Sequence, residues 1–307
     1  MHKIIFFGTS NFAVPSLQSL ASDERFEIAG IVTQPDRPVG RHAVLTPPAV
    51  KIAAPKGTLV FQPEKLKDES FKAWVTEFGP TCDAFVIVSY GKILPQWLLD
   101  LPKKGIVNVH GSLLPRWRGA SPIQAAIAAG DTATGVTVML IDAEMDHGPI
   151  LAQAEEPIMS DDTGGELHDR LAKLGGELLP GVLADYLDGR IEPKEQKHED
   201  ATYCKILTRD DGKLDPNDTA ENLEQLVFAY DPWPGTWIEK NGKRLKILEA
   251  MEGDPDKTRN PGDFFVRNGL PCLACAAGTV LVIKRLQPEG KKPMSGQEYL
   301  RGKNSWI

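Results

Sequence analysis

The chain has 307 residues, of which 41% are apolar, 25% charged and 7% aromatic. This is the composition of a globular protein, and the length favours two domains, since one domain takes roughly 100–200 residues. The four cysteines are unevenly spaced and do not make a secreted disulfide framework. The net charge of −7 argues against a wholly basic nucleic-acid binder.

Charge is distributed unevenly along the chain. Residues 1–200 carry 19 basic and 27 acidic side chains, whereas residues 240–307 carry 13 basic and 7 acidic ones. A basic C-terminal third on an acidic, enzyme-sized N-terminal part is the first functional clue. The apolar run at residues 4–7 is too short for a signal peptide, and no window approaches the roughly 18 apolar residues of a membrane span. We therefore expect a cytoplasmic protein.

The first 190 residues alternate short β-branched runs with longer amphipathic ones. The short runs predict buried strands at 4–7, 28–32, 58–61, 84–88, 106–109 and 135–141, and helical spacing predicts helices at 13–22, 63–78, 122–129 and 165–187. Alternation of this kind predicts a Rossmann-like α/β domain, with a mostly parallel sheet and helices on both faces. Ligands of such sheets bind beyond the carboxyl ends of the strands, so the chemistry is expected there.

The pattern changes after a charged, turn-rich stretch at 188–200, which predicts a linker. A bridging helix is expected at 220–229. Short runs at 237–238, 245–248, 263–266, 272–276 and 279–283, separated by glycine turns, predict a small antiparallel β-barrel of OB-like type. We therefore expect a catalytic domain at 1–188, a linker at 189–207 and a C-terminal domain at 208–307.

The glycine signal after the first strand is incomplete. A dinucleotide fingerprint needs glycines at three set positions, and in the segment GTSNFA at 8–13 only Gly8 is present. No acidic residue ends the second strand, where Val32, Thr33 and Gln34 stand. NAD binding is therefore disfavoured, and a strand–turn–helix with Ser10 or Asn11 near the helix cap is the better interpretation.

The densest polar cluster is the segment NVHGSLLP at 108–115, where the fifth predicted strand ends. Period-two alternation places Asn108 and His110 on the same side of that strand. An amide donor beside an imidazole can stabilise an oxyanion and move a proton in acyl transfer. The competing interpretation is that both side chains only satisfy local backbone groups.

A second polar loop, DAEMDHGP at 142–149, follows the next strand. A carboxylate from this loop could orient His110 and raise its basicity, as in catalytic triads. Spacing alone does not choose between Asp142, Glu144 and Asp146, and a solvated acidic loop is as good an interpretation.

Metal binding is disfavoured. No His-x-x-x-His or equivalent spacing is present. Cys272 and Cys275 form a single C-x-x-C in a strand-like run, where the two side chains fall on opposite faces, so small core residues are expected rather than zinc ligands.

At these segments the sequence resembles the methionyl-tRNA formyltransferase family over essentially the whole chain. The segment NVHGSLLPRWRGASPI at 108–123 is similar to the core signature of folate-dependent formyltransferases. The narrower tRNA-specific family is matched by GTS at 8–10 through Pro15, TQPDRP at 33–38, SYGKILP at 89–95 and DPWP at 231–234. The C-terminal domain with its Pro-Trp-Pro entry separates this family from glycinamide ribonucleotide and sugar formyltransferases.

The resemblance implies transfer of a formyl group from 10-formyltetrahydrofolate, a co-substrate, to the α-amine of initiator methionyl-tRNA, a step of translation initiation. It implies catalytic roles for Asn108, His110 and Asp146, and thereby selects Asp146 among the three acidic residues. It also implies folate contacts by Ser112, Leu113, Leu114, Pro115, Ser89, Tyr90 and Gly91. No metal is implied, and a monomer is expected.

The basic C-terminal part suits tRNA as a partner. We expect phosphate contacts from Lys243, Arg244, Lys246, Lys284 and Arg285, and as further candidates from Lys291, Lys292, Arg301 and Lys303, although a scattered solvated surface is the competing interpretation for each. Family members carry several basic residues in the loop after TQPD; here the loop keeps Arg37 and Arg41 but lacks the lysines beyond. Arg41 is the candidate for the acceptor-stem contact, with Arg37 beside it.

Three other functions compete with this one. The same folate site could serve an amino-sugar nucleotide acceptor, which the Pro-Trp-Pro entry and basic tail disfavour. An RNA-binding module with an inactive catalytic domain would not need Asn108, His110 and Asp146 intact. A nicotinamide dehydrogenase is disfavoured by the missing glycines.

Overall fold

The computed structural model describes residues 1–40, 43–302 and 306. Contacts divide it into two units, each described by itself. Unit 1 comprises Met1–Gly119, Thr134–Pro157 and His168–Tyr203, and unit 2 comprises Ala120–Ala133, Ile158–Leu167 and the chain from Cys204 onward.

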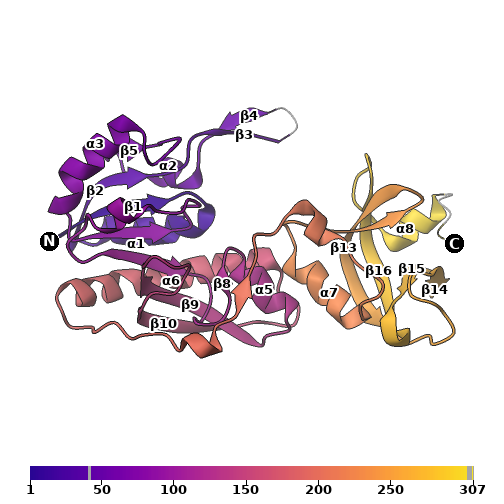
Figure 1. Cartoon of the computed structure of the whole chain (residues 1–307). Coiled ribbons are helices and arrows are strands. Elements are labelled where there is room, and N and C mark those ends of the chain that lie inside the picture. Colours follow the sequence, from indigo (N-terminus) through magenta and orange to yellow (C-terminus); the bar gives the residue numbers. More distant parts are fainter. Residues whose placement is uncertain (41–42, 303–305, 307) are drawn as a thin grey trace. The chain divides into compact units, whose positions relative to one another are not determined.

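Unit 1 is built on a seven-stranded sheet with the order β10-β9-β7-β6-β1-β2-β5 (Figure 1). Its strands are β1 (His2–Gly8), β2 (Phe26–Val32), β5 (Val60–Phe61), β6 (Ala84–Val88), β7 (Ile106–His110), β9 (Ala133–Leu140) and β10 (Ile150–Pro157). The pairs β1–β2, β1–β6, β2–β5 and β6–β7 are parallel, and β9 runs antiparallel to β7. The prediction of a mostly parallel sheet is confirmed.

The centre of this sheet is buried on both faces. In β1 the side chains of Ile4, Ile5, Phe6 and Phe7 have no exposed surface, as expected where helices cover both sides of a parallel sheet. Ile5 and Phe7 belong to a core cluster with Phe71 of helix α3 (Glu69–Phe78). By alternation, Ile4 and Phe6 face the other side of the sheet.

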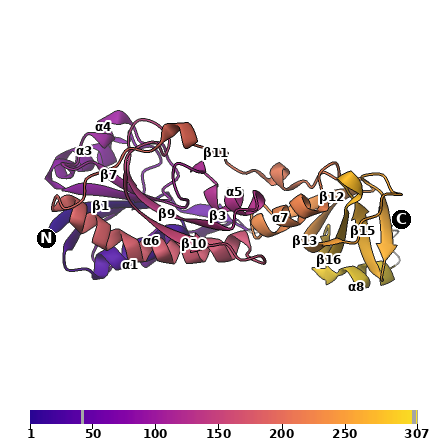
Figure 2. The same cartoon turned by 90° about the horizontal axis from the view of Figure 1, so that it is seen from below.

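That other side carries helices α1 (Val14–Ser22) and α6 (Gly164–Leu187), which lie side by side in Figure 2. Two adjacent glycines bring α6 close to its neighbours. A Cβ on Gly176 would lie 2.8 Å from the Pro15 backbone of α1, and one on Gly175 would lie 2.9 Å from Cγ1 of Val109 in β7. Larger side chains there would push α6 off the strand that carries Asn108 and His110.

Several local differences separate this unit from the sequence prediction. The helix expected at 63–78 begins only at Glu69, because the preceding loop is closed by the Asp68 carboxylate, which accepts from the Lys65 amide at 3.0 Å. The hairpin β3 (Arg37–Val39) and β4 (Val44–Thr46), and the strand β10, were not predicted. β10 alternates half-buried and exposed residues over most of its length, and its only large apolar side chains, Ile150 and Leu151, stand together at its start, which leaves little period-two signal.

The smaller elements of unit 1 are helices α2 (Ala49–Ala53) and α4 (Gln96–Leu99) and the short strand β8 (Arg118–Gly119), which pairs with β11 (Tyr203–Cys204). Through β11 and the residues before it, the segment expected as a linker is hydrogen-bonded to the loop that follows β7.

Unit 2 contains an antiparallel sheet with the order β12-β13-β16-β15-β14 and β17 paired with β16 (Figure 1). Its strands are β12 (Thr236–Lys240), β13 (Lys243–Gly253), β14 (Phe264–Arg267), β15 (Leu270–Ala274), β16 (Val280–Pro288) and β17 (Met294–Ser295). Helix α7 (Ala220–Ala229) lies where it was predicted and packs on β13 and on α5 (Pro122–Ala128). Closure of the sheet into an OB-like barrel stays a prediction.

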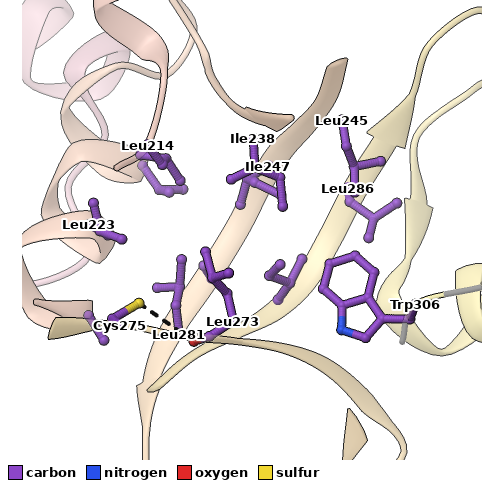
Figure 3. Packing of buried hydrophobic residues seen from close by; sticks show 14 of the residues in the cluster. Leu214, Leu223, Ile238, Leu245, Ile247, Leu273, Cys275, Leu281, Leu286 and Trp306 are labelled. Carbon is purple, nitrogen blue, oxygen red and sulfur yellow. Dashed lines mark hydrogen bonds between the residues drawn. The ribbon is translucent and has the colours of Figure 1, made fainter. Parts of the chain in front are cut away.

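Figure 3 shows the core of unit 2, where leucines and isoleucines of β12, β13, β15 and β16 pack against α7 and Trp306. The indole of Trp306 donates to the Cys272 carbonyl at 3.0 Å. The thiols of Cys272 and Cys275 are buried in two different clusters, which is the opposite-face arrangement predicted. Burial raises the pKa of Cys275 to about 11 and also raises that of Cys272.

Candidate active site

The carboxyl end of β7 carries the two residues singled out from the sequence. Asn108 is half-buried, and His110 is 6% exposed. Val109 between them points the other way, toward α6. Strand geometry therefore places Asn108 and His110 on the same face of the sheet, as the sequence predicted.

The two ring nitrogens of His110 have different surroundings. Nε2 lies 2.9 Å from the backbone oxygen of Trp117. A carbonyl oxygen can only accept a hydrogen bond, so Nε2 carries a proton. Nδ1 faces Oδ2 of Asp146 at 3.7 Å, which is too long for a hydrogen bond. The pair is close enough for electrostatic interaction but is not a closed triad contact.

Of the three acidic candidates in the loop after β9, Asp146 is the one paired with His110. Its Oδ2 accepts from the Gly119 amide at 2.8 Å, and its backbone φ of 50° is in the left-handed region. Asp142 instead binds Nδ1 of His147 at 2.6 Å, and Glu144 is exposed. Spacing alone did not choose among the three acidic residues, but the path of the loop brings only the Asp146 carboxylate to His110.

The loop after β7 is held by its neighbours β9 and β10. The hydroxyl of Thr137 donates to the Ser112 carbonyl at 2.6 Å and accepts from the Leu114 amide at 3.1 Å. Gln153 of β10 donates to the Leu114 carbonyl at 2.9 Å. Ser112 and Leu114 are buried and used in these contacts, whereas Leu113 and Pro115 keep part of their surface exposed.

The loop after β6 contributes Ser89, Tyr90 and Gly91. The hydroxyl of Ser89 is exposed and bonds with that of Ser10 at 2.7 Å. The Tyr90 carbonyl accepts from Thr9 at 2.9 Å and from Gln34 at 3.1 Å. These contacts join the loops that follow β1, β2 and β6, near the point where the strand order of the sheet reverses.

The ring of Tyr90 lies in the core of unit 1 and not at the surface. It packs edge-on against Phe7 at 5.5 Å between ring centroids, and its hydroxyl is buried with no hydrogen-bond partner among the described residues. Burial raises the pKa of this phenol. Any ligand contact of Tyr90 must therefore be made by its backbone.

Of the predicted basic residues that the structure describes, all but the half-buried Lys284 are exposed. On unit 2, register places Arg244 and Lys246 of β13 and Arg285 of β16 on one face of the sheet, where the Arg244 guanidinium lies 4.0 Å from the centre of the Trp237 ring. Lys243 is exposed, and Lys284 lies 3.9 Å from Glu249. In unit 1 the exposed Arg37 pairs with Glu64 at 2.9 Å.

Two predicted basic residues, Arg41 and Lys303, lie outside the described residues. Lys291, Lys292 and Arg301 are exposed.

One buried cation was not assigned a role from the sequence. Arg118 is 2% exposed, and its guanidinium donates to the side chains of Gln196 and His198. A buried arginine must be hydrogen-bonded, but its partners lie about eighty residues further along the chain, and no local pattern points to them.

Two further properties of the described residues concern metal ions and membranes. Over residues 1–40, 43–302 and 306, no group of three or more histidine, cysteine or acidic residues is placed to hold a metal ion. Among the helices of the same part of the chain, none combines the length and apolar character needed to cross a membrane.

Comparison with known proteins is consistent with this geometry. Residues 2–183 match the formyl transferase family, and residues 206–304 match the formyl transferase C-terminal domain family. The chain is 42% identical over 302 residues to a methionyl-tRNA formyltransferase of Chloroflexus aurantiacus, covering 98% of this chain and 96% of that protein.

Among solved structures, an N-formyltransferase of Helicobacter canadensis is similar with a TM-score of 0.68 and 18% identity, covering 94% of this chain and 100% of that one. HypX of Aquifex aeolicus is similar with a TM-score of 0.61 and 15% identity, covering 98% of this chain, which spans 49% of HypX. These two likenesses concern the fold alone. The sequence matches are more specific: the chain belongs to the formyl transferase family and, within it, to the methionyl-tRNA formyltransferases.

Proposed function

We propose that the protein transfers the formyl group of 10-formyltetrahydrofolate to the α-amino group of initiator methionyl-tRNA. The observation that carries the proposal is the arrangement at the end of β7, where Asn108 and His110 share a face and the Asp146 carboxylate lies 3.7 Å from the imidazole. The match to a methionyl-tRNA formyltransferase over 98% of the chain supports the choice of acceptor.

In this reaction the amine attacks the formyl carbon, and negative charge develops on the formyl oxygen. We assign Asn108 and His110 as hydrogen-bond donors to that oxygen. Because Nε2 of His110 is engaged by the Trp117 carbonyl, the ring must turn or exchange this partner to present an N–H to substrate. Asp146 stabilises the imidazolium form when the ring takes up a proton, and His110 or a water then relays the proton toward the leaving amine.

For the formyl donor we propose a binding site formed by the loops after β6 and β7. Partly exposed Leu113 and Pro115 offer apolar surface to a flat ring system, and the exposed Ser89 with Gly91 offers polar groups at its edge. Three further residues of these loops support this surface from below and do not contact the donor through their side chains, because those side chains are buried: Ser112, Leu114 and Tyr90. The Helicobacter canadensis N-formyltransferase was crystallised with folinic acid, which supports a folate for this fold.

For tRNA we propose phosphate contacts from the basic face of unit 2, formed by Arg244, Lys246 and Arg285, with Lys243 and Lys284 nearby. Arg37, the first residue of β3, and Arg41, which lies outside the described residues, are proposed to meet the acceptor stem. We further propose that residues 1–188 carry catalysis, that residues 189–207 connect them to a tRNA-binding part at 208–307, and that the protein works as a cytoplasmic monomer.

The test is a formyl-transfer assay with 10-formyltetrahydrofolate and four separate acceptors: initiator methionyl-tRNA, elongator methionyl-tRNA, free methionine and an amino-sugar nucleotide. We expect turnover on the initiator and little on the others. Turnover on the sugar nucleotide instead would show that the proposed acceptor is wrong, while the proposed donor site would stand. No turnover on any acceptor would overturn the proposal.

A further inference from the structure

One buried amide, in the part of unit 1 that the sequence predicted to be a linker, contacts the proposed active site. Gln196 is 5% exposed, although its sequence neighbours Glu195 and Lys197 are exposed. Its Nε2 donates to the backbone oxygens of Asp146 at 2.9 Å and Gly148 at 2.8 Å. Its Oε1 accepts from Arg118, at 3.1 Å from Nε and 2.7 Å from Nη2.

These four contacts use the whole hydrogen-bonding capacity of the side chain. A primary amide has two N–H donors and one oxygen with two lone pairs. Its orientation is set by its partners, because carbonyl oxygens need donors and a guanidinium needs an acceptor. A buried amide satisfied in this way occupies one position, and replacing it leaves buried groups on both sides without partners.

Gln196 holds the chain on both sides of the hydrogen bond that orients the Asp146 carboxylate, which is the bond from the Gly119 amide to Asp146 Oδ2. On one side, Gln196 holds the Asp146 backbone, whose φ of 50° is uncommon for a residue other than glycine. On the other side, it holds Arg118, and the next residue, Gly119, donates its amide to Asp146 Oδ2 at 2.8 Å. Both the carboxylate and its backbone donor are therefore placed by one amide.

Another residue of the same segment, Thr202, holds the backbone around Trp117, the second partner of His110. Thr202 accepts from the Trp117 amide through its hydroxyl at 2.9 Å, and its carbonyl accepts from the Arg118 amide at 2.9 Å. Trp117 has a φ of 58°, and its carbonyl is the group that faces Nε2 of His110. The segment thus contacts the backbone on both sides of the imidazole.

From this network we infer that Gln196 is a positioning residue for formyl transfer, which sets the Asp146 carboxylate against His110. The inference rests on the proposed function and adds a residue to it. Gln196 lies too deep behind Asp146 to touch substrate, so its effect is on the rate of the chemical step and not on substrate binding.

The alternative is that Gln196 only anchors the buried Arg118. Two substitutions separate the possibilities. Gln196→Glu keeps oxygen acceptors for the guanidinium but removes both donors to the Asp146 and Gly148 carbonyls, whereas Gln196→Met removes both functions. If anchoring Arg118 were the whole role, Gln196→Glu would restore the activity that Gln196→Met loses.

We expect both variants of the full chain to lower kcat roughly 10- to 100-fold, because small misplacement of a catalytic group costs that much. The KM values for both substrates should stay within about twofold, since uniform binding is untouched. In addition, the imidazole ¹⁵N chemical shifts of His110, recorded at one fixed pH, should move in both variants as they do in Asp146→Asn. Glu195→Ala, which replaces an exposed neighbour, is the matched control and should change neither kcat nor the His110 chemical shifts.

Wild-type kcat and unmoved His110 resonances in Gln196→Glu would overturn the inference. If Gln196→Met does not fold at the assay temperature, Gln196→Glu and Gln196→Asn carry the same test. The NMR comparison needs no turnover. If the wild-type protein fails to transfer formyl groups at all, the proposed function falls, while the His110 resonances still decide whether Gln196 positions Asp146.

Discussion

At the end of β7 in unit 1, polar groups are buried and held from several directions, whereas the basic side chains of β13 and Arg285 of β16 in unit 2 are exposed, and the ion pair of Arg244 with Asp210 is exposed too. His110 is 6% exposed and meets Trp117 and Asp146; Arg285 is exposed on its strand. Leaving a buried polar group without its partner costs about 1–3 kcal/mol, while an exposed ion pair contributes about 0–1 kcal/mol.

This difference in burial implies a difference in function. The first region can hold individual atoms in place, so single substitutions there should have large effects on rate. The second region supplies positive charge without fixing individual atoms, so its contribution to tRNA affinity should come from several residues together and should depend on salt. The predictions below test that contrast, beginning with the largest expected effect.

Asn108→Ala and His110→Ala should each lower kcat about 10²–10³-fold, because each removes a donor to the developing oxyanion. Thermal unfolding should change little by comparison with this loss, and steady-state kinetics with both substrates provides the measurement. Near-wild-type turnover of either folded variant would remove the role assigned to that residue.

Leu281→Ala should destabilise unit 2 by about 2–5 kcal/mol, since the leucine is fully buried in its core and a cavity would remain. Hydrogen exchange followed by mass spectrometry can localise the effect. Faster exchange should appear in peptides of β13, β15 and β16 and not in those of β1 and β6. Equal loosening of both units would show that they do not fold as separate bodies.

Replacing Arg244, Lys246 and Arg285 together by alanine should weaken tRNA binding and lower the slope of log affinity against log salt by about 2–3, because each phosphate contact contributes roughly 0.7–0.9. The KM for the formyl donor should not change. Binding titrations at several salt concentrations measure the slope, and a slope equal to that of the wild type would argue against phosphate contacts by this face.

Arg37→Ala should change the free energy of unfolding by no more than about 1 kcal/mol, because its pair with Glu64 is exposed on both sides. Its effect should be confined to tRNA affinity. Urea unfolding and tRNA binding on the same preparation compare the two, and Glu64→Ala serves as the control that breaks the same ion pair without removing the positive charge.

Much of the fold follows from local pattern. The strands at 84–88 and 106–110 and the helix at 220–229 were predicted nearly to the residue, because a buried strand or an amphipathic helix is encoded in its own few residues. The strand β10 and the β3–β4 hairpin were missed, because their weak apolar pattern becomes a strand only when a neighbour supplies hydrogen bonds.

The sequence by itself determined that Asn108 and His110 share a face, since that depends only on the period of two along one strand. The family resemblance pointed to Asp146, but spacing did not choose between it and Asp142, and the tertiary structure shows that Asp146 faces His110. Only the tertiary structure shows that Gln196 joins Arg118 to the Asp146 loop. The contacts of Gln196 connect residues 50 and 78 positions apart. Their geometry is set by how strands and loops pack together, and no periodicity within one segment encodes it.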